Sequence, residues 1–367
     1  MAFLKNSELM NFALEDNAGV YKTDAETTDP NVRFREVDCS VEVESEDDSR
    51  YLTGDWGSTD ENLTGVEMGT ISYSLKLAPG EFKDETSPSA GDAEHRLNYT
   101  ELLENGGLKV VEKGTSPTDT APGTYTFFPS KTQASKTASF AYFMTESTSS
   151  GLNGRVEALR GVMSSLTLSV DGRGAPFLIN GEGNGAVEKI EDIDEVDIPT
   201  YDDSTTTRTL GDKFLNTTVT ITDVTAGSSP INLCLSSMTL DFASENTEIE
   251  CQEGSGIKNY IITTIAPTME IDPLLKTLSE FDYWTGLREE HTYRIEISSE
   301  HIDILIPRVQ LNTTDVNETN GYMRNSLNFR TMRNIDSEIP SVLDTSDVDN
   351  AKEAMFFITI GESLADF

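Results

Sequence analysis

The sequence is poor in the residues that build metal sites and disulfide frameworks. Of its 367 residues, three are cysteines and three are histidines. The cysteines are too few and too scattered for a disulfide framework or a Cys-rich zinc site; they are Cys39, Cys234 and Cys251. No histidine belongs to a His-Glu-x-x-His motif or lies near a cysteine at metal-ligand spacing. We therefore expect no metal ion and no cofactor.

Positive charge and long apolar runs are scarce as well. Lys and Arg total 27 against 64 Asp and Glu, which gives a net charge of −37. A field of that sign repels nucleic acids and anionic membranes, although a saline habitat or simple solubility would explain the same acidity. No run approaches the ~20 apolar residues of a transmembrane helix, and Met1–Asn17 carries acids where a signal peptide is apolar. We expect a soluble protein made in a reducing compartment, with no membrane partner.

Catalytic motifs are missing too. The sequence has no Gly-x-Ser-x-Gly elbow, and the glycines of NGEGNG (Asn180–Gly185) are not followed by the Lys-Ser/Thr of a phosphate-binding loop. Asp315–Gly321 has its glycine one place too late for a calcium loop, and Ser326 stands where the twelfth-position Glu is required. Acid pairs carry little information in a chain with 64 carboxylates. The sequence therefore predicts no catalytic, cofactor-binding or metal-binding residues, and a protein that is not an enzyme.

Short runs that alternate apolar and polar residues dominate the chain. Such alternation is typical of β-strands with one buried and one solvated face; it occurs at Ile71–Leu77, Leu166–Val170, Val219–Ile221, Met238–Phe242, Tyr293–Ile297 and Ile302–Ile306. Gly- and Asp-rich segments such as Asn180–Gly185 punctuate these runs. Two helices are predicted: Asn98–Val110, with Asn98 as cap and Glu101 three residues on, and Asp272–Trp284, with Asp272 as cap and Pro273 first. The expected fold class is mainly β (α+β).

One pattern occurs twice in the same order, which predicts a duplication. Four landmarks are matched: Ser40–Asp47 with Thr239–Asn246, Ile71–Pro79 with Tyr260–Pro267, a helical pattern at Leu102-Leu103 with one at Leu274-Leu275, and Thr124–Ser130 with Thr292–Ser298. The alternative is that any β-rich chain offers such look-alikes. The duplication predicts two tandem β-sandwich or barrel domains at 37–200 and 201–335, each with one flanking helix. An N-terminal arm, 1–36, would precede them, with a short helical pattern at Leu9–Leu14, and a C-terminal segment, 336–367, would follow.

Five segments follow one another in a characteristic order: Leu102–Val111, Gly123–Ser130, the Gly-rich strand pair Ala158–Gly185, Asp303–Leu311 and Asn325–Asn334. This order resembles that of the tail tube proteins of long-tailed bacteriophages, and the resemblance covers roughly residues 37–335. The family implies a β-sandwich-like domain with a flanking helix, whose inner sheet joins those of its neighbours around a lumen. Rings of such domains stack head to tail into the tail tube. The expected location is therefore the virion tail, after synthesis in the host cytoplasm.

The resemblance also implies partners. These are further copies of the chain, the tape-measure protein, the tail terminator, and double-stranded DNA that passes through without specific binding. Some relatives fuse two domains, so the duplication favours a trimeric pseudo-hexamer ring, with a hexamer as the alternative. An acidic lumen would let DNA slide, because phosphate meets like charge. We expect Glu296 and Asp303, which lie on the polar faces of their strands, to face the lumen.

Two other classes of function fit part of the sequence. A capsid decoration, receptor-binding or baseplate protein would share the acidity and the Thr/Ser-rich strands, but it would form a compact oligomer that does not polymerise. A secreted β-sandwich enzyme or carbohydrate-binding module would need exposed aromatic platforms, and the only tryptophans are Trp56 and Trp284.

Overall fold

A computed structural model describes most of the 367-residue chain. The described residues are 8–27, 32, 34–46, 63–77, 99–113, 124–130, 136–148, 151–172, 174–194, 199, 214, 217–250, 257–319, 321–335, 339–340, 343 and 351–361. They form eighteen strands and three helices of four to six residues. The predicted mainly β fold class is confirmed.

The elements fall into two halves along the chain. The first half contains β1 (Glu8–Leu14), α1 (Asp24–Thr27), β2 (Glu36–Glu46), β3 (Leu63–Lys76), α2 (Thr100–Asn105), β4 (Leu108–Lys113), β5 (Thr124–Pro129), β6 (Ala138–Thr148), β7 (Gly151–Val170) and β8 (Leu178–Asp194). The second half contains β9 (Thr218–Asp223), β10 (Ile231–Leu233), β11 (Leu235–Asp241), β12 (Ser244–Glu250), β13 (Ile257–Ile265), β14 (Thr268–Pro273), α3 (Tyr283–Arg288), β15 (Thr292–Ser298), β16 (Ile302–Thr319) and β17 (Tyr322–Thr331). The last strand is β18 (Phe357–Ile360).

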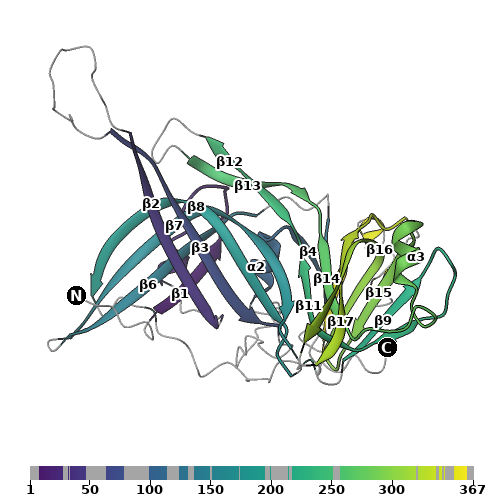
Figure 1. The fold of residues 1–367 in the computed structure, drawn as a ribbon. Helices are drawn as coiled ribbons and strands as arrows, with labels where there is room; N and C mark the ends of the chain where they lie inside the picture. The colour runs from purple at the N-terminus through teal and green to yellow at the C-terminus, as the bar shows by residue number, and fades with distance from the viewer. Residues whose placement is uncertain are drawn as a thin grey trace, which may run out of the picture.

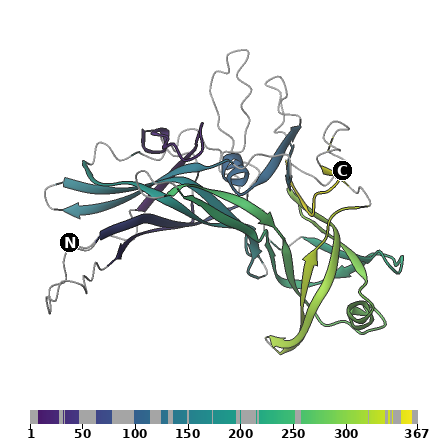
Figure 2. The ribbon, with the colours of Figure 1, turned by 90° about the horizontal axis from the view of Figure 1, so that it is seen from above.

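Sixteen of these strands form one antiparallel sheet that runs through both halves, and the β12–β13 hairpin forms a separate two-stranded sheet. Figure 1 shows most of the first half on the left and the second half on the right, with β4 among the strands on the right and β12 and β13 above the place where the halves meet. Seen from above, in Figure 2, the strands continue from one half into the other as a bent layer. β18 pairs with both β16 and β5, so the chain's last strand ties the β4–β5 hairpin to the second half.

The order of strand pairing in the first half recurs in the second. The first half pairs in the order β1-β6-β7-β8-β3-β2, and the second half pairs in the order β9-β15-β16-β17-β14-β11. When the six strands of each series are ranked by their order along the chain, both series pair in the same order: first, fourth, fifth, sixth, third, second. A short helix follows β3 in one half and β14 in the other.

The register matches as well. The Leu77 amide donates to the Phe177 carbonyl at 2.9 Å, as the Leu275 amide donates to that of Met323 at 3.1 Å. Four residue pairs of the first half have equivalent pairs in the second half. The pair Tyr73–Gly181 corresponds to Ile271–Leu327, and Lys76–Leu178 corresponds to Leu274–Arg324. The pair Ser169–Leu178 corresponds to Asn317–Arg324, and Asp38–Ser72 corresponds to Thr239–Glu270.

The two halves meet through the strands β7 and β11. β7 is twenty residues long, and β6 pairs with its first part, as far as Val162. Beyond that point β11 takes the same side of β7, with Thr239 opposite Ser169 and Asp241 opposite Thr167. The β7·β11 junction therefore continues the sheet from the first half into the second.

Both predicted helices need correction. The first spans only Thr100–Asn105, after which Gly107 takes a φ of +84° and the chain continues as β4, paired with β5. Its N-cap residue is Tyr99, with no side-chain cap bond, and Asn98 lies outside the described residues. The second prediction was wrong: Thr268–Pro273 is β14, because Met269 and Ile271 alternate into the core between β11 and β17. The helix there is Tyr283–Arg288, capped by Asp282.

Two further local predictions were wrong for related reasons. Glu8–Leu14 is a strand, not a helix, because side chains on both of its faces are covered: Met10 packs in the main core and Ala13 in a second cluster. A strand covered on both faces has a continuous apolar run without strand periodicity.

The glycines of Asn180–Gly185 lie inside β8 and do not form a turn. A Cβ on Gly181 would stand 2.2 Å from Cζ of Tyr73, so the Tyr73 ring requires a glycine opposite it.

Only part of the predicted repeat matches the order of pairing. Ser40–Asp47 begins in β2, and Thr239–Asn246 begins in β11, which are equivalent strands. Thr124–Ser130 contains β5, whereas Thr292–Ser298 is β15, whose equivalent is β6. Leu102 and Leu103 lie in α2, but Leu274 and Leu275 follow a strand. Ile71–Pro79 begins in β3, whereas Tyr260–Pro267 begins in β13, which is not its equivalent; Pro79 itself lies outside the described residues.

Candidate functional site

The most informative surface is one face of the sheet, on which a single row of polar residues crosses both halves. Successive register partners on eight adjacent strands define this polar row: Glu36, Ser74, Asn180, Thr167, Asp241, Thr268, Arg330 and Gln310. Side chains alternate between the faces of a sheet. The polar row therefore marks a face turned away from the core.

The opposite face shows the same continuity with apolar residues. Its register partners define an apolar row: Leu75, Ile179, Leu168, Leu240, Met269, Phe329 and Leu311. Each of these side chains is at most 4% exposed and belongs to the main core cluster. A one-residue slip in any pairing would move the whole apolar set of that strand to the wrong face. Burial therefore fixes the register, including that of the β7·β11 junction.

Acids outnumber bases on the polar face. The polar row and the rows beside it, Asp38-Ser72-Glu182-Ser165 and Lys76-Leu178-Ser169-Thr239-Glu270-Asn328-Thr313, contain five acids and two bases: Glu36, Asp38, Glu182, Asp241 and Glu270, with Lys76 and Arg330. Within the described ranges, none of these acids forms an ion pair with a Lys or Arg. Glu270 accepts from Ser326 at 2.8 Å, and Asp241 from Thr167 at 3.4 Å. The face is therefore rich in unneutralised negative charge.

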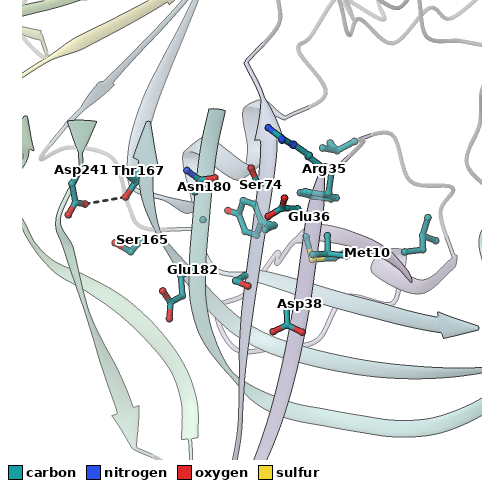
Figure 3. A pocket seen from close by; sticks show the side chains of 17 residues that line it. Met10, Arg35, Glu36, Asp38, Ser74, Ser165, Thr167, Asn180, Glu182 and Asp241 are labelled. Atoms are coloured by element: carbon teal, nitrogen blue, oxygen red, sulfur yellow. Dashed lines mark hydrogen bonds between the residues drawn. The ribbon is translucent and has the colours of Figure 1, made fainter. Parts of the chain in front are cut away.

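An open hollow of about 1270 Å³ lies beside this face. Figure 3 shows side chains of the polar row along one side of it, with the Thr167–Asp241 hydrogen bond drawn, and Met10 and Arg35 on the other side. Glu36 and Asp38, which also line the hollow, come from β2, the last strand of the sheet. The hollow therefore adjoins an open edge of the sheet.

Several strand edges are open in the described parts of the chain, among them those of β1, β4 and β10, but two others have equivalents that are joined within the chain. β2 pairs only with β3, so its outer edge has no partner strand. In β16, residues up to Gln310 pair with β15, but the stretch from Asn312 onward has β17 alone. The open stretch of β16 is the equivalent of the part of β7 that pairs with β11, and β2 is the equivalent of β11. Open edges present unpaired backbone groups that can pair with another chain.

Glu296 and Asp303, predicted from the sequence to face a lumen, lie together but away from the polar row. Glu296 is on β15 and Asp303 on β16, diagonal neighbours in a stretch that also pairs with β9 and β18. Glu296 contacts the Arg294 guanidinium, and Asp303 accepts from Ser298 Oγ at 2.5 Å. Their orientation toward a lumen stays a prediction.

The acids of the polar face were not predicted, although their signal was present. Asp241 occupies a polar position in the alternating run Met238–Phe242, and Glu182 lies between glycines. Alternation shows that such a residue faces away from the core, but it does not show which strands are neighbours. Sequence reasoning therefore missed the row.

Comparison with known proteins gives no identification. No protein-family model matches the chain, and no curated protein matches it.

Among the described residues no group of three or more His, Cys, Asp or Glu side chains could hold a metal ion, and none of the described helices is long and apolar enough to span a membrane. His291 Nδ1 lies 2.7 Å from Asp223. Burial, with Glu157 close by, raises the pKa of the Cys39 thiol to about 12, so this cysteine is a poor nucleophile.

Proposed function

We propose that the chain is a self-assembling structural protein in which the open β2 edge of one copy pairs with the open β16 edge of the next. The observation that carries this proposal is the β7·β11 junction, where equivalents of these two edges are already joined within the chain. The matched registers give the expected pairing between copies. Asp38 would lie opposite Asn317 as Thr239 lies opposite Ser169, and Cys39 opposite Val316 as Leu240 lies opposite Leu168.

Two tandem domains joined in this way would lead to a closed assembly. If the halves are a duplication, each junction within a chain and each junction between chains applies a similar rotation, and a repeated rotation that closes gives a ring. Closure would also cover the open edges of β2 and β16. Three chains would then supply six halves, the trimeric pseudo-hexamer, and six chains are the alternative.

The polar face gives such a ring a role. If it lines the lumen, its unneutralised acids repel phosphate and let DNA pass without adhering, while the apolar row stays within the wall. Together with the sequence resemblance, this supports a phage tail tube protein. Stacked rings would form the tail tube for DNA ejection, with the tape-measure protein inside during assembly and the tail terminator at the end.

Sedimentation velocity and negative-stain electron microscopy of the purified chain over a range of concentrations test this function. The expected result is hollow rings and stacked tubes, whose end-on symmetry distinguishes three chains from six. Compact oligomers without a central hole at every concentration would contradict it and would favour the alternative, a capsid decoration, receptor-binding or baseplate protein.

A further inference from the structure

An apolar corner at the end of the second half is exposed where its counterpart in the first half is buried. The apolar corner consists of Leu275, which follows β14, Val316 on β16 and Met323 on β17. These side chains are 36%, 49% and 48% exposed. Leu275 and Met323 are joined by a 3.1 Å main-chain hydrogen bond, and Val316 and Met323 share one face of the β16–β17 pair. The corner therefore continues the apolar face of the sheet into solvent.

The equivalent residues of the first half are Leu77, Leu168 and Phe177, and all three are completely buried. Two residues of the second half take part in their burial. Leu240 of β11 pairs with Leu168, and the Phe214 ring packs edge-on against Phe177 with centroids 5.9 Å apart. Phe214 lies just before β9, the first strand of the second half. In the first half, therefore, the next half along the chain covers the corner.

The first half contains counterparts of the two elements, Leu240 and Phe214, that help to bury the corner of the first half. Cys39 on β2 is the equivalent of Leu240. The sequence Phe214-Leu215 stands shortly before β9, and Phe3-Leu4 stands shortly before β1. The structure describes the chain from residue 8, so Phe3 and Leu4 are known here from sequence alone. A second copy that adds its β2 to β16 would bring the same two elements to the apolar corner.

We propose that the apolar corner of one copy binds the N-terminal residues Phe3 and Leu4 of a second copy, seated beside its β2 edge. This inference rests on the proposed self-assembly and names the surface and the segment that would drive it. Apolar area removed from water stabilises association in proportion to that area. In this arrangement an aromatic anchor enters a desolvated corner, which is the usual character of an interface hot spot.

The test compares the full-length chain with the single variants Phe3→Ser and Met323→Ser, the double variant, and Val224→Ser as a control. Val224 is 41% exposed and lies in the turn after β9, outside the corner. Sedimentation velocity gives the concentration at half-association, and thermal unfolding shows whether each variant is folded. We expect Phe3→Ser and Met323→Ser each to raise the concentration at half-association at least tenfold, and Val224→Ser to leave it unchanged. The double variant should be little worse than the more affected single one, because both remove one contact.

The outcomes separate this inference from the proposed function. Association that is insensitive to both corner variants overturns the inference, whereas hollow rings in the same samples would keep the proposed function. Association that depends on both residues but gives only compact oligomers keeps the inference and contradicts the tube. A wild-type chain that stays monomeric at all concentrations contradicts both.

Discussion

The packing of Phe214 on Phe177 can be tested by the substitution Phe214→Ala. The Phe214 side chain is 7% exposed, and its ring meets that of Phe177 at 79°. Its main-chain hydrogen bonds with Gly174 and Ala175 do not involve the ring and would remain. Phe→Ala substitutions in cores cost about 3–5 kcal/mol through lost burial and the remaining cavity. Phe214 lies at the margin of the core, so we expect the low end, about 3 kcal/mol.

Urea unfolding measures this loss. The midpoint should fall while the slope against denaturant stays unchanged, because the native state keeps its surface. Ile335→Ala is the matched control: Ile335 is 63% exposed, so its substitution should change the free energy of unfolding by less than about 0.5 kcal/mol. A loss below about 1 kcal/mol for Phe214→Ala would refute the idea that this residue covers the corner of the first half, and with it the model for the role of Phe3.

Three further predictions concern local features of the fold. Gly181→Ala should destabilise the protein by about 1–3 kcal/mol in thermal or urea unfolding, because the new Cβ would stand 2.2 Å from Tyr73 Cζ; an unchanged midpoint would show that the ring can move freely. At pH 8 a maleimide should label the exposed Cys234 much faster than Cys39, whose pKa is raised to about 12 by burial and which therefore stays a thiol; equal rates by peptide mass spectrometry would contradict this. Asp282→Ala removes the carboxylate that accepts from the Thr285 amide at 2.9 Å and should cost about 1 kcal/mol of unfolding free energy, whereas Asp282→Asn should restore most of it.

The sequence was enough to locate many strands, because alternation reports a buried and a solvated face directly. Leu166–Val170 and Tyr293–Ile297 are clear examples, and both lie in strands of the sheet. Where a strand is covered on both faces, as at Glu8–Leu14, the alternation disappears and a helical pattern takes its place. At Asp272-Pro273, a cap followed by proline predicted a helix start, but tertiary pairing of β14 with β11 and β17 prevailed.

The polar face could not be predicted because it depends on pairing between distant segments. Glu36 and Gln310 lie at opposite ends of one row, and nothing local in either segment indicates the other. The same is true of the β7·β11 junction. Its existence follows from the burial of Leu168 and Leu240 against one core, which is a property of the folded chain and not of either strand alone.

The central claim is that β2 of one copy pairs with β16 of the next, and disulfide cross-linking tests it most directly. The variant with Asp38→Cys and Asn317→Cys places both new thiols at exposed positions that are opposed in the expected register. Cα atoms of opposed antiparallel residues stand about 4.5–5.5 Å apart, which suits a disulfide. Thr239→Cys with Ser169→Cys is the equivalent pair within the chain and controls for geometry. Asp38→Cys with Thr313→Cys is out of register.

Under mild oxidation, the account predicts covalent dimers and trimers of the Asp38→Cys, Asn317→Cys variant on a denaturing gel, with the series ending at three chains if the ring is a trimer. The control within the chain should stay monomeric in mass while losing the two introduced thiols, and the out-of-register pair should react far more slowly. Absence of covalent oligomers, or equal cross-linking by the out-of-register pair, would contradict the β2–β16 junction.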